Sequence, residues 1–499
     1  MTDVASGHGS VPEPWTAPGN LCAEVHETHT GVVTLLGGRA FKAKKAVRTD
    51  FCDFTTVAHR EAACRRELML NRRLAPGSYD GIGYFQAPGG QREPVVVMRR
   101  YPDAARLATL VRDGESVDAD LARIAVLLAG FHRCAVRGPT IDAEATAAAT
   151  AARWEENLTE LRRHAGSVLS IRAVDEITTR AMTFIGGRGP LFAQRIAARR
   201  VVDGHGDLLA DDIFCMPDGP VLLDCLEFDD RLRFVDGLDD AAFLAMDLEF
   251  CGRVDLAERF LDSYRGEAAD PAPRSLADFC VAYRAVVRAK VDCVRITQGH
   301  SEAAVDAQRH LAIALRHVRA GSVHLVVIGG GPGTGKTTVA QALAGRIGAR
   351  VISTDEVRRQ LRDAGALAGQ AGELNAGLYA PAQVAAVYDE VLRRARESLE
   401  LGWPVILDGT WRDGAHRQRA RDIARETKSE VTEFVCGAPV ASAVQRIAQR
   451  GPSASDATPE IATALGGAVE DWPQAHRLDT TRPVEDSVAE AQRRCCASA

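Results

Sequence analysis

Hydrophobic and polar positions change their spacing several times along the chain, and each change marks a new kind of element. Hydrophobic runs over residues 31–36 and 39–48 are separated by a Gly-Gly pair, which predicts a β-hairpin. Residues 60–74 have helical spacing, and the apolar run 94–101 predicts another strand. The N-terminal part is therefore expected to form a small sheet with one helix.

Helical spacing dominates from about residue 104 to about residue 320. The segment 118–135 has one apolar face, made of Leu121, Ile124, Leu128 and Phe131. Residues 201–228 interrupt the helices with loops and short strands. From residue 324 onward, apolar strands alternate with helices to the end of the chain, which is the pattern of a parallel α/β sheet.

A chain of 499 residues is expected to form two or three domains, at roughly 100–200 residues each. The predicted fold class is multidomain, α+β followed by α/β with a parallel sheet. We expect four parts: a flexible tail at 1–20, a strand-rich lobe at 21–103, a helical lobe at 104–320 and an α/β domain at 321–499.

Composition and charge narrow the classes of function. The net charge is -6 and 46% of residues are hydrophobic, so no nucleic-acid footprint is expected. No apolar run reaches the roughly 18–20 residues that span a bilayer, and the first residues lack the pattern of a secretory signal. The twelve cysteines contain no C-x-x-C pair. These features predict a cytoplasmic protein without structural metal or membrane contact, and they leave the oligomeric state open.

Lysine is rare in this chain. Arginine supplies 55 of the 61 basic residues, and the six lysines are Lys42, Lys44, Lys45, Lys290, Lys336 and Lys428. A lysine in such a background suggests that an ammonium group was needed and a guanidinium would not serve. Chance clustering is the alternative for the three lysines at 42–45.

A phosphate-binding loop follows the strand at 324–328. Gly330-x-x-x-x-Gly335-Lys336-Thr337 is a complete Walker A motif, and a helix follows it. Glycines let backbone N–H groups surround phosphates, the lysine reaches the outer phosphates, and the threonine hydroxyl can hold Mg²⁺. We expect ATP to bind at Gly330, Gly331, Pro332, Gly333, Thr334, Gly335, Lys336, Thr337 and Thr338.

Further residues of this C-terminal part suit phosphoryl transfer. Asp408 ends an apolar strand, as the metal-binding carboxylate of a Walker B strand does. Asp355 follows the second strand and is either a site residue or a plain helix N-cap. Arg446 and Arg450 share one helical face and are either a phosphate-gripping lid or solvated.

Residues 323–480 resemble P-loop small-molecule kinases of the chloramphenicol phosphotransferase, gluconate kinase and zeta-toxin group, and the domain also resembles an AAA family ATPase. The resemblance rests on the Walker loop, on Asp355 after the second strand, on Asp408-Gly409-Thr410 and on Arg417. It implies that Asp355 acts near the acceptor hydroxyl and that Arg417 is the downstream basic residue of the site.

A second, ordered set of residues lies upstream. Asp207, in "HGD", takes the place of a kinase catalytic aspartate, and Asp224 lies 17 residues later, where a metal-bridging aspartate is expected. Asp212 stands where such loops carry Asn, yet a carboxylate has the same reach and suits Mg²⁺. Metal binding by Asp212 and Asp224 is therefore expected to survive.

Lys44 and Glu67 precede this loop in the order of a kinase phosphate lysine and its glutamate partner. Lys42 is an alternative to Lys44, because alternate residues of a strand share one face. Glu61 is likewise an alternative to Glu67. His205 is expected to hold the loop by hydrogen bonds, and the six acids from Asp229 to Asp247 are expected to be mostly helix caps and solvated residues.

Residues 22–315 resemble the aminoglycoside phosphotransferase family, which is protein-kinase-like and has "HGD" in its catalytic loop. "KAKKAV", "ELMLNRRL", "HGDL", "LDCLEF", "LRFVD" and "AFLAMDLE" resemble a bacterial family in which this domain is fused to a P-loop kinase domain. The resemblance implies a bilobal kinase-like domain before the P-loop domain, and ATP and Mg²⁺ as cofactors.

The predicted function is an ATP- and Mg²⁺-dependent phosphotransferase with two nucleotide-binding modules, which transfers the γ-phosphoryl group to small-molecule hydroxyls. Asp207 and Asp355 would lie near acceptors, and Lys44 and Lys336 near phosphates. The alternative is an N-terminal pseudokinase that binds ligand without transfer and is regulated by a P-loop ATPase. The sequence does not identify the acceptor.

Overall fold

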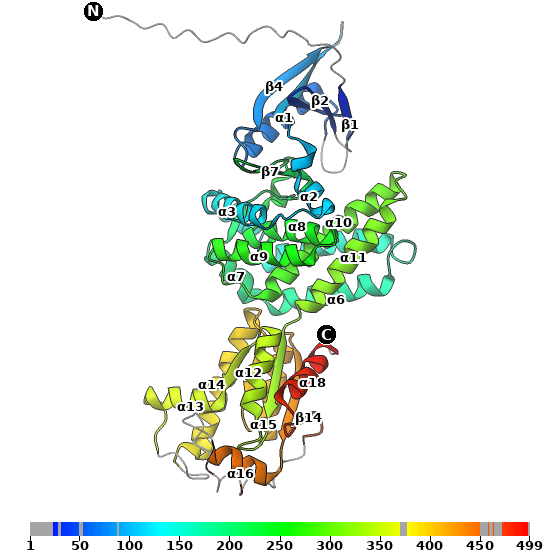
Figure 1. Cartoon of the computed structure of the whole chain (residues 1–499). Helices are drawn as coiled ribbons and strands as arrows, with labels where there is room; N and C mark the ends of the chain where they lie inside the picture. The colour runs from blue at the N-terminus through cyan, green and yellow to red at the C-terminus, as the bar shows by residue number, and fades with distance from the viewer. Residues whose placement is uncertain are drawn as a thin grey trace, which may run out of the picture. The chain divides into compact units, whose positions relative to one another are not determined.

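The computed structural model of the chain describes residues 23–27, 31–48, 53–86, 89–369, 377–449, 458, 463 and 472–497 (Figure 1). Two compact units are present: Met1–Glu115 with Asp211–Asp230, and Ser116–Ala210 with Arg231–Ala499. The expected tail at 1–20 lies outside the described residues. The second unit contains both the helical lobe and the α/β part, and the four-part division of the chain stays a prediction.

The first unit is built on a five-stranded antiparallel sheet, in the order β1-β2-β3-β5-β4. Its strands are β1 (Glu24–Glu27), β2 (Gly31–Leu36), β3 (Arg39–Lys44), β4 (Tyr79–Gln86) and β5 (Arg92–Arg99). The predicted hairpin is confirmed as β2–β3, with Gly37 at φ +54° in its turn, but β3 ends at Lys44, short of residue 48. The strand at 79–86 was missed because its polar and glycine residues hide the alternation.

Helix α1 (Val57–Asn71) packs on β4 and β5, and Thr56 caps it by accepting from the His59 N–H. The core between them contains Cys64, Tyr79, Val96 and Met98. The rest of the unit consists of α2 (Leu107–Asp113) and the hairpin of β7 (Ile213–Met216) and β8 (Gly219–Leu222).

The second unit begins with helices and one two-stranded sheet. Its elements are α3 (Asp118–Cys134), α4 (Pro139–Ala143), α5 (Ala147–Arg163), α6 (Ile171–Gly187), α7 (Gly189–Ala197), β6 (Val201–Asp203), β9 (Phe234–Asp236), α8 (Gly237–Phe250), α9 (Val254–Glu267), α10 (Arg274–Thr297) and α11 (Ala303–Ala320). The predicted apolar face of α3 buries Leu121, Ile124 and Leu128, whereas Phe131 is only partly buried. Helix α8 is buried almost throughout, which makes it the centre of this lobe.

A five-stranded parallel sheet follows, in the order β11-β12-β10-β13-β14. The elements are β10 (His324–Gly329), α12 (Lys336–Ile347), β11 (Arg350–Ser353), α13 (Thr354–Asp363), α14 (Pro381–Glu400), β12 (Val405–Asp408), α15 (Gly414–Glu426), β13 (Glu430–Gly437), α16 (Val440–Ala448), β14 (His476–Asp479) and α18 (Val484–Ala497). Buried residues of the inner strands and of α12 and α18 form its core.

The predicted fold class is confirmed: an α+β part with an antiparallel sheet precedes an α/β part with a five-stranded parallel sheet. Among the described residues, no helix combines the length and apolar character needed to cross a bilayer.

Candidate functional site

The carboxyl ends of three parallel strands bring the C-terminal candidates to one edge of the sheet. Ile328 of β10 and Ser353 of β11 are both in register with Asp408 of β12. The phosphate-binding loop follows β10, and Asp355 follows β11, so the loop and both aspartates share this edge. Ligands of open α/β sheets bind at this edge.

The phosphate-binding loop needs its glycines for two reasons. Gly330 and Gly333 have φ of +143° and +74°, which favour glycine. A Cβ on Gly333 would also collide with the carbonyl oxygen of Ala443 at α16. The loop end is fixed by Thr480, whose hydroxyl donates to the Thr334 carbonyl at 2.6 Å. The backbone angles and the close approach of Ala443 thus require glycine in this loop.

Thr337 and Asp408 form the candidate metal site. The Thr337 hydroxyl donates to Asp408 Oδ2 at 2.7 Å. Asp408 is 2% exposed, and its Oδ1 has no hydrogen-bond partner within the described chain. Burial raises the pKa of this carboxyl, and the Lys336 charge opposes that rise. A buried carboxylate oxygen without a partner, next to the Walker threonine, fits a Mg²⁺ ligand set.

Asp355 is placed by its helix and by an arginine. Ser353 occupies the N-cap position of α13, so Asp355 lies inside the first turn and is not a plain cap. Arg358, one turn later, donates to Asp355 Oδ1 at 2.7 Å and lies over the Tyr379 ring. The sequence analysis missed Arg358; the three-residue spacing on a helix was the available signal.

The other predicted arginines differ in their surroundings. Arg446 is exposed and donates to the Thr480 carbonyl at 2.7 Å, and its Nη1 lies 3.6 Å from where a Cβ of Gly335 would stand. It is therefore beside the phosphate loop. Arg450 lies outside the described residues. Arg417 is buried and donates to the Trp411 and Arg412 carbonyls, which fixes the segment after β12.

A cluster of charged side chains occupies the inner face of β3 in the first unit. Lys42 contacts Glu67 at 3.0 Å and Asp224 at 2.5 Å. Lys44 contacts Glu67 at 2.7 Å and forms a second ion pair with Glu227. Both lysines thus meet the same glutamate. We call these five residues the lysine cluster.

Burial distinguishes the members of the lysine cluster. The side chains of Lys44 and Glu67 are 1% and 0% exposed, whereas those of Lys42 and Asp224 are 13% and 43% exposed. Burial alone would lower the pKa of the Lys42 ammonium, but the charges of Asp224, Glu67 and Glu227 hold that pKa well above its ordinary value. Burial likewise opposes ionisation of Glu67, yet the two lysines hold its pKa below the ordinary value. The neighbouring opposite charges therefore favour the charged forms of Lys42 and Glu67.

Glu61, the alternative to Glu67, lies elsewhere. It pairs with Arg65 and accepts from the Tyr84 hydroxyl. Glu227 was missed by the sequence analysis, although the quoted segment "LDCLEF" contains it.

The β7–β8 hairpin brings Asp212 and Asp224 to one end. Asp212 precedes β7, Asp224 follows β8, and the Leu223 N–H donates to the Asp212 carbonyl at 3.0 Å. Asp224 has a φ of +61°, and its N–H donates to the Tyr79 hydroxyl at 3.3 Å. Two carboxylates at the open end of one hairpin fit a Mg²⁺ site.

The candidate catalytic loop with Asp207 lies in the second unit and is held by hydrogen bonds to a carboxylate of α8. Asp240 accepts from the His205 and Gly206 N–H groups at 2.7 and 2.8 Å and contacts the His132 ring at 2.9 Å. The Asp207 N–H donates to His205 Nδ1 at 3.3 Å. His205 is fully buried, as expected for a residue that holds the loop.

The expectation for the acids at 229–247 was partly wrong. Asp236 caps α8, but Asp240 is fully buried and Asp239 forms a buried ion pair with Arg284 at 2.9 Å. Asp247 accepts from the Ala210 N–H at 2.7 Å. The loop around Asp207 lacks regular structure, so its N–H groups need side-chain acceptors, and carboxylates of α8 provide them.

Comparisons with known proteins identify one domain of the chain and several relatives. The AAA domain family matches residues 325–465, which supports the predicted P-loop domain. Uncharacterized proteins of Mycobacterium bovis and of two strains of Mycobacterium tuberculosis are each 54% identical over 469 residues, which is 94% of this chain and 94% of theirs.

Solved structures are similar to separate parts of the chain. A choline/ethanolamine kinase family protein from Mesorhizobium loti covers 59% of this chain and 92% of its own length, with 15% identity and a TM-score of 0.38. A gluconokinase from Sinorhizobium meliloti covers 35% of this chain and 91% of its own, with 17% identity and a TM-score of 0.26. The family match and the P-loop geometry support a kinase or phosphotransferase in general.

Proposed function

The chain belongs to the same family as these mycobacterial proteins, and from that premise we propose that it is an ATP- and Mg²⁺-dependent phosphotransferase with two nucleotide-binding modules. Each module would transfer the γ-phosphoryl group to a hydroxyl of a small molecule. The observation that carries the proposal is the Thr337–Asp408 contact beside the phosphate loop, with a buried Asp408 oxygen that lacks a partner.

In the P-loop module, the acceptor oxygen attacks the γ-phosphorus and the bond from that phosphorus to the ADP oxygen breaks. The hydroxyl proton passes to the Asp355 carboxylate, which Arg358 orients from the same helix face. Lys336 and Arg446 stabilise the charge of the transferring group. Thr337 and Asp408 would hold Mg²⁺, which neutralises phosphate charge when it is bound.

In the N-terminal module, Asp207 would receive the acceptor proton, and Asp212 and Asp224 would hold Mg²⁺. We propose Lys42 as the phosphate-binding lysine, because it is the more exposed of the two and contacts the metal-site residue Asp224 at 2.5 Å. Lys44 is enclosed between Glu67 and Glu227 and positions Glu67.

The test uses the full-length chain, labelled ATP, and a panel of sugars and other hydroxylated metabolites. Lys336→Ala should abolish transfer by the P-loop module and leave transfer by the N-terminal module. Asp207→Asn should do the reverse, and the double variant should be inactive. Arg493→Met, which changes an exposed arginine of α18, serves as the control. Transfer by the double variant at the wild-type rate would refute the proposal.

The same variants separate the two candidate lysines and the pseudokinase alternative. In the Lys336→Ala background, Lys42→Met should weaken Mg²⁺–ATP binding at least tenfold in calorimetry, because a charge-assisted contact to phosphate is lost. The double variant Lys44→Met/Glu227→Leu should change the affinity for Mg²⁺–ATP less than Lys42→Met does. ATP binding without transfer in the Lys336→Ala variant would instead support an N-terminal pseudokinase.

A further inference from the structure

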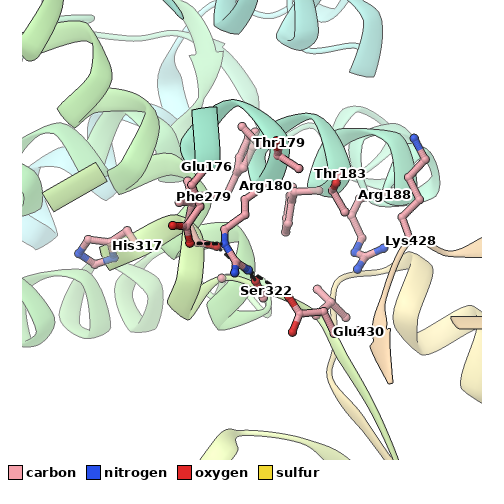
Figure 2. A pocket seen from close by; sticks show the side chains of 15 residues that line it. Glu176, Thr179, Arg180, Thr183, Arg188, Phe279, His317, Ser322, Lys428 and Glu430 are labelled. Carbon is pink, nitrogen blue, oxygen red and sulfur yellow. Dashed lines mark hydrogen bonds and ion pairs between the residues drawn. The ribbon is translucent and has the colours of Figure 1, made fainter. Parts of the chain in front are cut away.

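A pocket of about 340 Å³ lies in the second unit, where α6 and α11 meet the first residues of β10 and β13. Its lining includes Arg180, Phe184, Arg188, Phe279, Ser322 and Lys428. Figure 2 shows Arg188 and Lys428 toward one end and His317 toward the other, with Arg180 between them. The volume is in the range of small-molecule sites.

Arg188 is a buried cation without a carboxylate partner. Its side chain is 1% exposed and donates to the Gly187 carbonyl at 3.0 Å, to the Thr427 carbonyl and to the Ser429 hydroxyl at 3.2 Å. Its Nε has no hydrogen-bond partner, and no ion pair of Arg188 occurs within the described ranges. Burial lowers the pKa of Arg188 to about 10. The charge of Glu400 opposes this fall of the pKa, but it forms no ion pair with Arg188. A buried cation without a direct ion pair is costly, so a bound anion would complete this environment.

Lys428 adds a second positive charge at the same end. It is exposed, and the described part of the chain offers it no ion pair or hydrogen bond. Its side chain lies across Gly186, where a Cβ would collide with the Lys428 Nζ. Lys428 is also one of only six lysines in an arginine-rich chain. Its side chain is therefore placed at this end of the pocket by close packing against a glycine.

The acidic residues of the pocket are already neutralised. Glu176 pairs with Arg180 at 2.9 Å and with Arg319 at 2.7 Å, and Arg180 also contacts Glu430 at 3.0 Å. Among the described residues that line the pocket, Arg188 and Lys428 are the cations that form no ion pair. Excess positive charge at one end of the pocket favours an anionic ligand.

The neighbouring wall is apolar. The rings of Phe184 and Phe279 stack with their centroids 4.4 Å apart, and Val318 and Val323 also line the pocket. We propose that this pocket binds a small organic anion, with its carboxylate, sulfonate or phosphate group at Arg188 and Lys428 and its apolar body along this wall.

The pocket is separate from the phosphate loop but lies on the strands that lead to the candidate transfer site. Ser322 and Val323 precede β10, which ends at the loop, and Glu430 begins β13, which leads to α16 and Arg446. A six-residue strand spans about 20 Å. Because the ligand would contact both strand starts, its binding is expected to change nucleotide affinity at the loop.

The probe for the test is 8-anilinonaphthalene-1-sulfonate, which combines a sulfonate with aromatic rings. Its fluorescence is titrated against the full-length chain with Mg²⁺ and a non-hydrolysable ATP analogue in excess, so that nucleotide sites are filled. Wild type should show one saturable site. Lys428→Met and Arg188→Met should each weaken the affinity for the probe at least tenfold, because each variant removes a charge-assisted contact. The matched control Arg493→Met should bind as wild type does.

The Lys428→Met variant is the decisive one, because Lys428 is exposed and its replacement should leave the fold intact. A thermal melt of the variant checks that it is folded. Wild-type probe affinity in that variant would overturn the anion site and leave Arg188 as a tether to the Thr427 carbonyl. In a second titration, the probe should change the affinity of wild type for the ATP analogue at least threefold. The probe should change the affinity of the Lys428→Met variant for the same analogue less. An unchanged wild-type affinity would overturn the coupling.

Discussion

Replacing Lys44 with Met removes a positive charge from a place that water does not reach. The Lys44 and Glu67 side chains are 1% and 0% exposed, and Glu227 is 12% exposed. Breaking a buried ion pair costs about 3–5 kcal/mol, because the remaining charge stays uncompensated. Lys42 still holds Glu67 at 3.0 Å in the variant, so the lower end, about 3 kcal/mol, is expected.

Hydrogen exchange of the β2 and β3 amides measures this cost locally, without requiring the whole chain to unfold in one step. A loss of about 3 kcal/mol accelerates exchange roughly 150-fold. Arg39→Met is the matched control on the same strand. The Arg39–Asp80 pair is 45% and 43% exposed, and such pairs contribute about 0.2–1 kcal/mol.

The double variant Lys44→Met/Glu227→Leu should recover most of the lost protection, because it removes both charges and keeps apolar volume. Two results would refute the reasoning. One is exchange in Lys44→Met no faster than in Arg39→Met. The other is exchange in the double variant as fast as in the single one.

Two further predictions concern stability. Asp240→Asn should lower the stability of the helical lobe by about 2 kcal/mol. The two Asp240 oxygens accept from the His205 and Gly206 N–H groups, and an Asn would keep one acceptor and turn its NH2 toward the other donor. Thermal melts compare this variant with Glu258→Gln, an exposed control, and equal shifts in melting temperature would contradict the prediction. The pKa of Glu67 is held below its ordinary 4.5, so its stabilisation is present above about pH 4.5 and is lost as the pH falls through the folded-state pKa. Hydrogen exchange of the β3 amides, followed from pH 6 downward, should show that loss as reduced protection. The Glu67→Gln variant should lose less protection over the same pH range.

Local chemistry explains what could be predicted at the phosphate loop. Its ligands are consecutive residues between a strand and a helix, so the motif, the strand ending in Asp408 and the parallel sheet could all be expected from the sequence. The Thr337–Asp408 contact joins residues 71 positions apart in the sequence. It could still be expected, because the carboxyl ends of parallel strands always meet at the same edge of a sheet.

The arrangement of the lysine cluster was harder to predict from the sequence. Lys42 and Lys44 share one strand face, which the sequence indicated, but their relative depth depends on the hairpin that carries Asp224 and Glu227, more than 180 residues away. Neither the spacing of residues nor the composition indicates how deeply each lysine is buried. The buried acids of α8 were misjudged for a similar reason, since a charged residue is usually solvated unless a partner is supplied from elsewhere.

The sequence by itself determined the order of elements, the phosphate loop and the residue types available for phosphoryl transfer, because these depend on neighbours along the chain. The tertiary structure alone decided which charges are buried and with whom they pair. It placed Lys44 between two glutamates, tied the loop before Asp207 to Asp240, and left the buried Nε of Arg188 without a hydrogen-bond partner at a pocket. Burial and pairing arise from segments far apart in sequence, and they set the free energy of each charge.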